Sequence, residues 1–347
     1  MNTDIIQEDL ERAQKVVNDA AKGLEGGHLL ITGGAGFIGS YVVDFVHHLN
    51  TALLSEPAKI TVIDNFITGI PENLKHLKDK ITLISHDIIK PIEIKEDITH
   101  MIHAASIASP LFYRKHPLET MDVNVIGTRN MLELARKKGP KSFMFLSTSE
   151  IYGDPDPKHI PTKEDYRGFV SCCGPRACYD ESKRYGETMC AVFHERYGLP
   201  IKTTRMFNVY GPRLSLEDKR VIPDFIKNVR EDKDIIMFSD GSPTRSFCYI
   251  SDSVAGHFLV LLKGAEGEAY NIGNDKEEIS MRQLAQTVID VSGKPLKVVF
   301  DKSEDEHYLT DNPLRRCPDI TKLKQLGYDP KVMLKEGLAR TMKWHSS

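Results

Sequence analysis

Short apolar runs alternate along this chain with longer segments in which apolar residues recur every three or four positions. The runs have the length of buried strands, and they lie at residues 28–32, 60–64, 81–86, 100–104, 142–147 and 201–207. The longer segments predict amphipathic helices at residues 38–49, 116–138 and 179–197. Because strands that alternate with helices form a parallel sheet covered on both faces, the pattern predicts an α/β fold with a doubly wound parallel sheet.

The pattern changes on both sides of this predicted sheet domain, which spans residues 28–207. After residue 207 the elements become shorter and richer in Pro and Gly. We therefore expect a smaller, substrate-binding lobe over residues 208–347, with some segments returning to the sheet domain. Within residues 1–27, apolar residues recur at helical spacing. We expect this added helix to pack on the domain or on a partner subunit; docking of another protein is the alternative.

A glycine-rich turn, from Gly33 to Gly39, follows the first predicted strand and opens the first predicted helix. Such glycines permit close approach of the backbone to a pyrophosphate, whose charge then lies at the helix N-terminus. The next strand ends in Asp64, whose carboxylate suits the two ribose hydroxyls and repels a 2′-phosphate. The sequence thus predicts a Rossmann-type NAD site that includes Gly33, Gly36, Phe37, Ile38, Gly39 and Asp64. The spacing to Asp64 is long, which we attribute to a loop insertion at residues 50–58.

A second motif predicts proton transfer. Tyr179 and Lys183 are four residues apart, so on a helix their side chains face the same way. The Lys183 ammonium would lower the pKa of the Tyr179 phenol. A hydroxyl from Thr148 or Ser149 could hold a substrate alcohol between them. Because a base that takes the proton of an alcohol needs a hydride acceptor, the two motifs together predict an NAD-dependent enzyme.

Composition narrows the class of protein further. The net charge is −3 with no cluster of basic residues, which predicts neither nucleic-acid nor anionic-membrane binding. No apolar run approaches the ~18 residues of a membrane span, and the acidic N-terminus does not resemble a signal peptide. The six cysteines lack C-x-x-C spacing, so we expect free thiols in the cytoplasm. The histidines do not fall at metal-ligand spacing, and we expect no metal.

Four segments match the motifs of a known family, namely residues 64–69, 147–154, 174–181 and 314–320. On these segments the chain resembles the extended short-chain dehydrogenase/reductases of the NAD-dependent epimerase/dehydratase family, which remodel nucleotide sugars. Within them it is most similar to UDP-glucuronate decarboxylase, also called UDP-xylose synthase. The resemblance extends over nearly the whole chain from about residue 28.

The resemblance implies roles for individual residues. Thr148 and Tyr179 would engage the 4-hydroxyl of the sugar, Lys183 would hold the nicotinamide ribose, Glu150 would assist proton movement near C5, and Arg316 would lie near the reacting carbons. The implied NAD contacts also include Asn65, Phe66, Thr68, Gly69, Asp87, Ile88, Ala104 and Asn124, besides Tyr179 and Lys183. The implied contacts with the nucleotide-sugar substrate, a UDP-sugar, are Tyr113, Asn208, Arg220, Arg245 and Arg316.

The implied reaction has a simple chemical logic. Oxidation of the 4-hydroxyl to a ketone places the 5-carboxylate beta to a carbonyl, so CO₂ can leave while its electrons delocalise into an enolate. The same hydride then returns to C4, and NAD is regenerated in each turnover. Arginines suit the diphosphate because their planar fork matches anionic oxygens.

Three alternatives stay open. A nucleotide-sugar 4,6-dehydratase typically carries Asp-Glu after the threonine, where this chain has Ser149-Glu150. A 4-epimerase needs only the tyrosine–lysine pair and room for the ketosugar to rotate. A non-catalytic NAD sensor would usually have lost the tyrosine or the lysine, and both are present. The departures from the decarboxylase pattern are Ser182, the loop at residues 103–110, the insertion and the N-terminal helix.

Two apolar stripes predict a homodimer. In similar enzymes the corresponding two helices pair across a two-fold axis as a four-helix bundle, and an isologous interface is a common way to bury such stripes. The stripes here are Val125, Met131, Leu132 and Leu134 on one helix, and Met189, Val192 and Phe193 on the other. The alternative is that both stripes face their own sheet.

Overall fold

A computed structural model describes residues 2–302 and 310–346. Its centre is a seven-stranded, fully parallel sheet with the strand order β11-β6-β5-β4-β1-β2-β3. The strands are β1 (His28–Thr32), β2 (Lys59–Asp64), β3 (Thr82–Ser85), β4 (His100–His103), β5 (Ser142–Thr148), β6 (Ile201–Met206) and β11 (Ala269–Ile272). The predicted doubly wound α/β fold is therefore confirmed.

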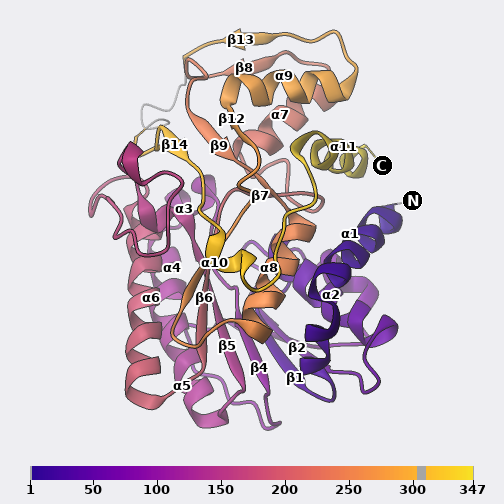
Figure 1. Ribbon diagram of the computed structural model, residues 1–347, viewed down its shortest axis with the longest axis vertical. Helices are drawn as coiled ribbons and strands as arrows, with labels where there is room; N and C mark the ends of the chain where they lie inside the picture. Colours follow the sequence, from indigo (N-terminus) through magenta and orange to yellow (C-terminus); the bar gives the residue numbers. More distant parts are fainter. Residues whose placement is uncertain (1, 303–309, 347) are drawn as a thin grey trace.

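Helices cover both faces of this sheet (Figure 1). Alternate residues of β5 point to opposite faces: Met144 and Leu146 join the core beneath α2 (Phe37–Ala52) and α8 (Ile250–Lys263). Phe143 and Phe145 join the core on the other face, beneath α5 (Thr128–Lys138) and α6 (Ala177–Tyr197). Both faces are apolar because a parallel sheet is buried on both sides.

The chain beyond residue 208 contributes to both parts of the molecule. α8 and β11 return to the large sheet, whereas the short strands before and after them form small sheets, most of which lie in the upper part of Figure 1. The short strands are β7 (Val209–Tyr210), β8 (Ile235–Met237), β9 (Thr244–Ser246), β10 (Cys248–Tyr249), β12 (Glu278–Ser280), β13 (Val298–Phe300) and β14 (Arg315–Arg316). The helices are α7 (Val221–Arg230), α9 (Met281–Ser292), α10 (Thr321–Lys324) and α11 (Leu334–His345).

The observed helices correct two expectations. α2 continues to Ala52, so only residues 53–58 of the predicted insertion form a loop. Asn50 closes this loop, because its side chain bonds both the N–H and the carbonyl of Ala58 at 2.8 Å. The helix predicted at 116–138 is three joined pieces: α4 (Pro117–Asp122), a π-helical turn η3 (Val123–Gly127), and α5.

The remaining elements are short. They are α3 (Pro110–Lys115), η1 (Asn18–Leu24), η2 (Pro71–Leu77), η4 (Ser149–Tyr152) and η5 (Pro157–His159). No helix in the described ranges is both long and apolar enough to cross a membrane.

The N-terminal helix α1 (Asn2–Val17) packs on its own domain, against α2, α8 and α11. Asp9 anchors it, because this buried carboxylate accepts hydrogen bonds from Arg340 at 2.8 Å and from Tyr249 at 2.9 Å. Burial raises the pKa of Asp9 to about 6, although Arg340 and the tyrosine hydroxyl favour its ionised form. Of the two placements expected for this helix, the structure shows the first.

The two stripes assigned to a subunit interface are mostly core. Five of their residues are buried against the sheet of their own chain, namely Met131, Leu132, Leu134, Met189 and Phe193. Of the other two, Val125 is half-buried and Val192 is exposed, with 50% of its surface accessible. The assignment of these five residues to a dimer interface is therefore wrong, because the period of a helix does not say which side meets the sheet.

We expect Arg340→Met to lower the free energy of unfolding by about 3–5 kcal/mol, because it leaves the buried Asp9 carboxylate without its cation. Arg12→Met is the control, since the Arg12–Glu336 pair at 2.7 Å is 37% and 44% exposed and should cost less than ~1 kcal/mol. Urea unfolding followed by the fluorescence of the single tryptophan, Trp344 on α11, measures both. Equal losses would show that Asp9 does not anchor α1.

Candidate active site

One cavity lies along the carboxyl ends of β1, β2, β4 and β5, where ligands bind in doubly wound sheets. It contains most of the side chains that the sequence analysis assigned to NAD. Those in its wall are Gly33, Gly36, Phe37, Ile38, Gly39, Asp64, Asn65, Thr68, Gly69, Asp87, Ile88, Ala104, Tyr179 and Lys183. Phe66 and Asn124 are not in the wall.

The glycine turn has the geometry of a dinucleotide cradle. Gly33 has a positive φ of 70°, a backbone angle that residues other than glycine rarely adopt. A Cβ at Gly39 would lie 2.0 Å from the carbonyl oxygen of Gly33, so only glycine allows this close turn. Asp64 braces it by accepting hydrogen bonds from the N–H groups of Ala35 at 2.9 Å and Phe66 at 2.8 Å. Burial raises the pKa of Asp64.

The opposite wall is a segment between β7 and α7 that was not singled out as a cofactor contact. It contributes Arg213, Ser215, Asp218 and Arg220 to the cavity. Arg213 pairs with the buried Asp44 of α2 at 2.7 Å, and the carbonyl of Asp218 accepts a hydrogen bond from Ser109 at 2.9 Å. These two contacts hold the segment across the cavity. Arg220, predicted to contact substrate, lines the same cavity and pairs with Asp218.

Tyr179 lies between Thr148 and Tyr113. Its hydroxyl is hydrogen-bonded to the Thr148 side chain at the end of β5. Its ring stacks on that of Tyr113, with centroids 5.2 Å apart and planes within 7°. Lys183, one turn further along α6, donates to the carbonyl of Leu146 at 2.8 Å. These contacts fix the phenol at the edge of the cavity, beside the end of β5.

Burial changes the electrostatics that the tyrosine–lysine motif predicts. It raises the pKa of Tyr179 well above its usual value, although the hydrogen bond to Thr148 works in the opposite direction. It lowers the pKa of Lys183 to about 7. The expectation that Lys183 gives Tyr179 a lowered pKa is therefore wrong for the protein alone, because burial disfavours both charged forms.

Glu150, at the start of η4, lies between two guanidinium groups. One carboxylate oxygen pairs with Arg176, just before α6, and the other with Arg316 on β14. Burial raises the pKa of Glu150, but the two cations outweigh it and hold that pKa at about 2. Glu150 is thus ionised at neutral pH and has no proton to donate.

Arg176 is the residue of this cluster that sequence reasoning missed. The signal was present, because Arg176 lies within the matched segment 174–181, three residues before Tyr179. Its Nε is 3.7 Å from the carboxylate of Asp180. Burial and the charge of Glu150 raise the pKa of Asp180 to about 7. Two carboxyl groups that share one arginine therefore differ strongly in their affinity for a proton.

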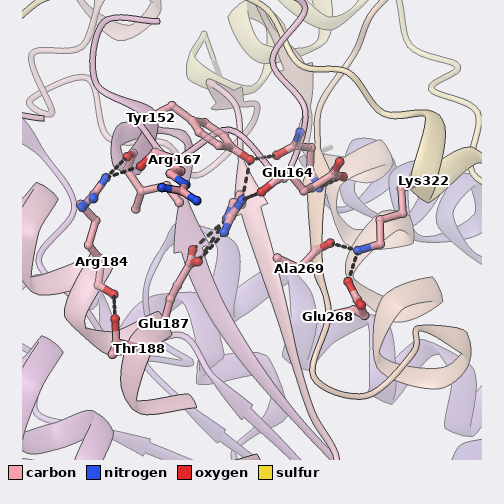
Figure 2. A network of polar contacts seen from close by, with 12 residues as sticks. Tyr152, Glu164, Arg167, Arg184, Glu187, Thr188, Glu268, Ala269 and Lys322 are labelled. Atoms are coloured by element: carbon pink, nitrogen blue, oxygen red, sulfur yellow. Dashed lines mark hydrogen bonds and ion pairs between the residues drawn. The ribbon is translucent and has the colours of Figure 1, made fainter. Parts of the chain in front are cut away.

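A buried network beneath this cluster holds η4 against α6. Arg205 of β6 pairs with Glu187 of α6 at 2.7 Å and donates to the hydroxyl of Tyr152 in η4 at 2.8 Å. Arg184 of α6 donates to the carbonyl of Ile151 at 2.8 Å. Figure 2 shows Tyr152, Arg184 and Glu187 in this network. The segment that carries Glu150 is thereby fixed relative to the helix that carries Tyr179 and Lys183.

Other predicted residues are bound elsewhere. Asn124, in the π-helical turn, is buried between the hydroxyls of Ser106 at 2.8 Å and Ser182 at 2.9 Å. Asn208 donates to the carbonyl of Ser246 at 2.8 Å. Ser149 is buried at the start of η4.

Arg245 also donates its hydrogen bonds to other groups of the protein. It bonds the carbonyls of Thr244 and Pro313 and the side chain of Asn312. Burial and the charge of Arg316 lower the pKa of Arg245 to about 9. Over the described ranges, no group of three or more His, Cys, Asp or Glu side chains could hold a metal ion.

The parallel sheet, the glycine cradle and the Tyr179–Lys183 pair define a class of Rossmann-type, dinucleotide-dependent short-chain dehydrogenase/reductase. Comparison with family models places the chain within that class. The chain belongs to the NAD dependent epimerase/dehydratase family, whose model matches residues 29–273.

Known relatives agree with this assignment. UDP-glucuronic acid decarboxylase 5 of Arabidopsis thaliana is 41% identical over 313 residues, which cover 89% of this chain and 86% of that protein. A solved UDP-glucose 4-epimerase of Thermotoga maritima, with UDP-glucose, is 28% identical, with a TM-score of 0.78, covering 92% and 98% of the two chains. A dTDP-glucose 4,6-dehydratase of Streptomyces venezuelae, with NAD bound, is 27% identical, with a TM-score of 0.77, covering 92% and 97%.

We expect the protein to bind NAD more than tenfold more tightly than NADP, because the Asp64 carboxylate repels a 2′-phosphate. Asp64→Ala should narrow this ratio. Asn65→Ala is the control: it lies beside Asp64 in the cavity wall but carries no charge, and it should leave the ratio unchanged. Calorimetric titration with both dinucleotides measures the ratio, and equal affinities of the wild type would count against the role of Asp64.

Proposed function

We propose that this protein decarboxylates UDP-glucuronate to UDP-xylose through a 4-keto intermediate, with NAD recycled in each turnover. The observation that carries the proposal is the ionised Glu150 between Arg176 and Arg316, next to the Tyr179–Thr148 pair. The 41% identity to a plant UDP-glucuronic acid decarboxylase supports it over most of the chain.

The first step needs a base and a hydride acceptor. Because burial keeps Tyr179 protonated in the protein alone, we propose that it ionises when the cationic nicotinamide binds and then takes the proton of the 4-hydroxyl. Thr148 would hold that hydroxyl in place, and Lys183 would bind the ribose next to the nicotinamide. NAD, when bound, accepts the hydride from C4 and later returns it. The cavity that contains the glycine cradle, Tyr179 and Lys183 supports this arrangement, because one wall serves both cofactor and alcohol.

The second step needs a site for a carboxylate. The Glu150 cluster contains the cations Arg176, Arg316 and Arg245 with the carboxyl groups of Glu150 and Asp180, and the charges of Asp154 and Asp311 also act on it. The Nε–H groups of Arg176 and Arg316 are buried and have no hydrogen-bond partner among the described residues, so we propose that they donate to an anionic sugar beside Tyr179. A neutral hexose, as an epimerase would bind, has no carboxylate for these donors. Because Glu150 is ionised, we propose that it first acts as a proton acceptor or holds a water molecule, and donates a proton to C5 only after it has gained one.

We also propose that residues 28–207 with α8 and β11 form the NAD-binding part, that the short strands and helices beyond residue 208 bind the nucleotide sugar, and that the enzyme acts in the cytoplasm. The return of α8 and β11 to the large sheet supports their place in the NAD-binding part.

The test is to incubate the purified protein with NAD and UDP-glucuronate and to follow CO₂ and a UDP-pentose by mass. Tyr179→Phe keeps the ring but removes the acidic proton, so turnover should fall by ~10²–10⁴ fold while NAD still binds. Tyr197→Phe, on the same helix but 40% exposed, is the matched control and should keep full activity.

Glu150→Gln should behave differently from Tyr179→Phe. Because Glu150 acts after the first oxidation, its loss should slow the overall reaction yet permit a pulse of NADH absorbance when substrate is added. Full turnover by Glu150→Gln would contradict its role. If the wild type changed another sugar and left the carboxylate of UDP-glucuronate intact, the 4-epimerase or dehydratase alternative would replace the decarboxylase.

We propose that the enzyme is a homodimer that pairs α4–α5 and α6 of two copies. The exposed apolar residues of these helices support it, and all but Val192 differ from those first assigned. They are Leu118, Met121, Ile126, Tyr185 and Val192. α4 and α6 pack against each other, so the exposed residues lie on neighbouring helices.

In light scattering at micromolar concentration we expect twice the chain mass of 39.1 kDa. The double substitution Ile126→Arg and Val192→Arg should give the monomer, because it buries two charges in an isologous interface. Val299→Arg, at a residue 43% exposed on β13, is the control and should stay dimeric. A monomeric wild type would overturn the assembly.

A further inference from the structure

Three buried hydrogen-bond donors around Glu150 and Tyr179 have no partner within the described part of the chain. They are the Nε atoms of Arg176 and Arg316 and the hydroxyl of Tyr113, and Oδ1 of Asp180 beside them also lacks a partner. Buried polar groups are nearly always hydrogen-bonded, so each exception needs an explanation. All three belong to residues that pair with Glu150 or stack on Tyr179. Their common position points to a ligand that bonds them when it is present.

The charge of the cluster says what kind of ligand this is. Glu150 is the carboxylate that pairs with both Arg176 and Arg316. The contact between Arg176 and Asp180, at 3.7 Å, is too long for a hydrogen bond. A second carboxylate would bond the free Nε donors of the two guanidinium groups.

Arg176 is better placed than Arg316 to change partners. Arg316 is on β14, which pairs with β9, and it also donates to the carbonyl of Gly153. Arg176 precedes α6 at the end of residues 170–176, which form no helix or strand. It lies three residues before Tyr179 in the sequence, and its charge acts on the hydroxyl of Tyr113. A guanidinium at this position can turn from Glu150 towards a group bound beside the two stacked tyrosines.

We propose that Arg176 binds the carboxylate of the substrate, and that Glu150 occupies this guanidinium only until the substrate arrives. The inference rests on the proposed function, which places the sugar carboxylate next to the carbon whose hydroxyl faces Tyr179. Arg176 keeps a carboxylate on its planar fork throughout the exchange. Arg176 therefore distinguishes UDP-glucuronate from UDP-xylose, which has lost the carboxylate. Glu150, then paired with Arg316 alone, takes up a proton more readily than when it pairs with both arginines.

The test measures binding, not turnover. In a Tyr179→Phe background with NAD bound, calorimetry gives the affinity for UDP-glucuronate and for UDP-xylose. Arg176→Met should weaken the binding of UDP-glucuronate about 10- to 100-fold, as expected for the loss of a hydrogen bond to a charged group. It should leave the affinity for UDP-xylose within about threefold of the parent value. Arg315→Met is the matched control. Its guanidinium pairs with Glu278 at 2.6 Å and is 43% exposed, so neither affinity should change.

Two further variants separate ligand recognition from folding. Arg176→Lys keeps the charge and should recover part of the discrimination, whereas thermal melting shows whether each variant is folded. Glu150→Gln removes the competing anion, so it should bind UDP-glucuronate more tightly than the parent by about threefold or more and leave UDP-xylose unchanged. Weaker binding of UDP-glucuronate by folded Glu150→Gln would overturn the exchange.

The outcomes distinguish this inference from the proposed function. An equal loss of affinity for both nucleotide sugars in Arg176→Met, or no loss for either, would show that Arg176 only supports Glu150. In that case the wild type would still release CO₂ from UDP-glucuronate. If the wild type released no CO₂ but Arg176→Met still lost affinity selectively for UDP-glucuronate, the decarboxylase proposal would fail while the carboxylate site stood.

Discussion

The buried guanidinium of Arg205 is the interaction on which the geometry of the site depends. It joins three elements: β6, which carries it, α6 through Glu187, and η4 through Tyr152. Tyr152 in turn donates to Asn271 of β11, which ties the edge of the sheet to the same centre. A buried charge is tolerated only when it is paired, so these elements cannot shift independently without a cost of several kcal/mol. Glu150, Tyr179 and Lys183 inherit their relative positions from this constraint.

The site above Arg205 works by placing titratable groups in environments that separate their proton affinities. Two cations hold Glu150 ionised, burial keeps the Tyr179 phenol protonated, and burial lowers the pKa of Lys183 to about 7. Acid–base catalysis at neutral pH requires groups whose pKa values are separated in this way. Each of these pKa values changes when a neighbouring charge arrives. A cationic cofactor ring and an anionic sugar would therefore adjust the same groups in opposite directions.

Local patterns in the sequence predicted what is local in the structure. The glycine turn from Gly33 to Gly39 and the pair Tyr179–Lys183 each lie within one element or one turn, and the six predicted strands were found close to their expected positions. Long-range partners could not be predicted, since Arg316 is 166 residues from Glu150. β11 was missed because its four residues, two of them Ala269 and Asn271, are too short and too polar to show as a strand. The pKa of Tyr179 and the inward orientation of Met189 and Phe193 could not be predicted either, because both depend on how deeply packing buries these residues.

The ion pair between Asp9 and Arg340 has a consequence for how the protein is made. Its two residues are 331 positions apart, and at bacterial or eukaryotic rates of synthesis, roughly 5–20 residues per second, the carboxylate is made tens of seconds before its cation. Helix α1 leaves the ribosome before the helices on which it packs, yet its ion pair forms only after α11 has been made. During that interval its apolar face, which later packs on α2 and α8, is available to chaperones. The synthesis of α11 therefore completes the attachment of α1 to the fold.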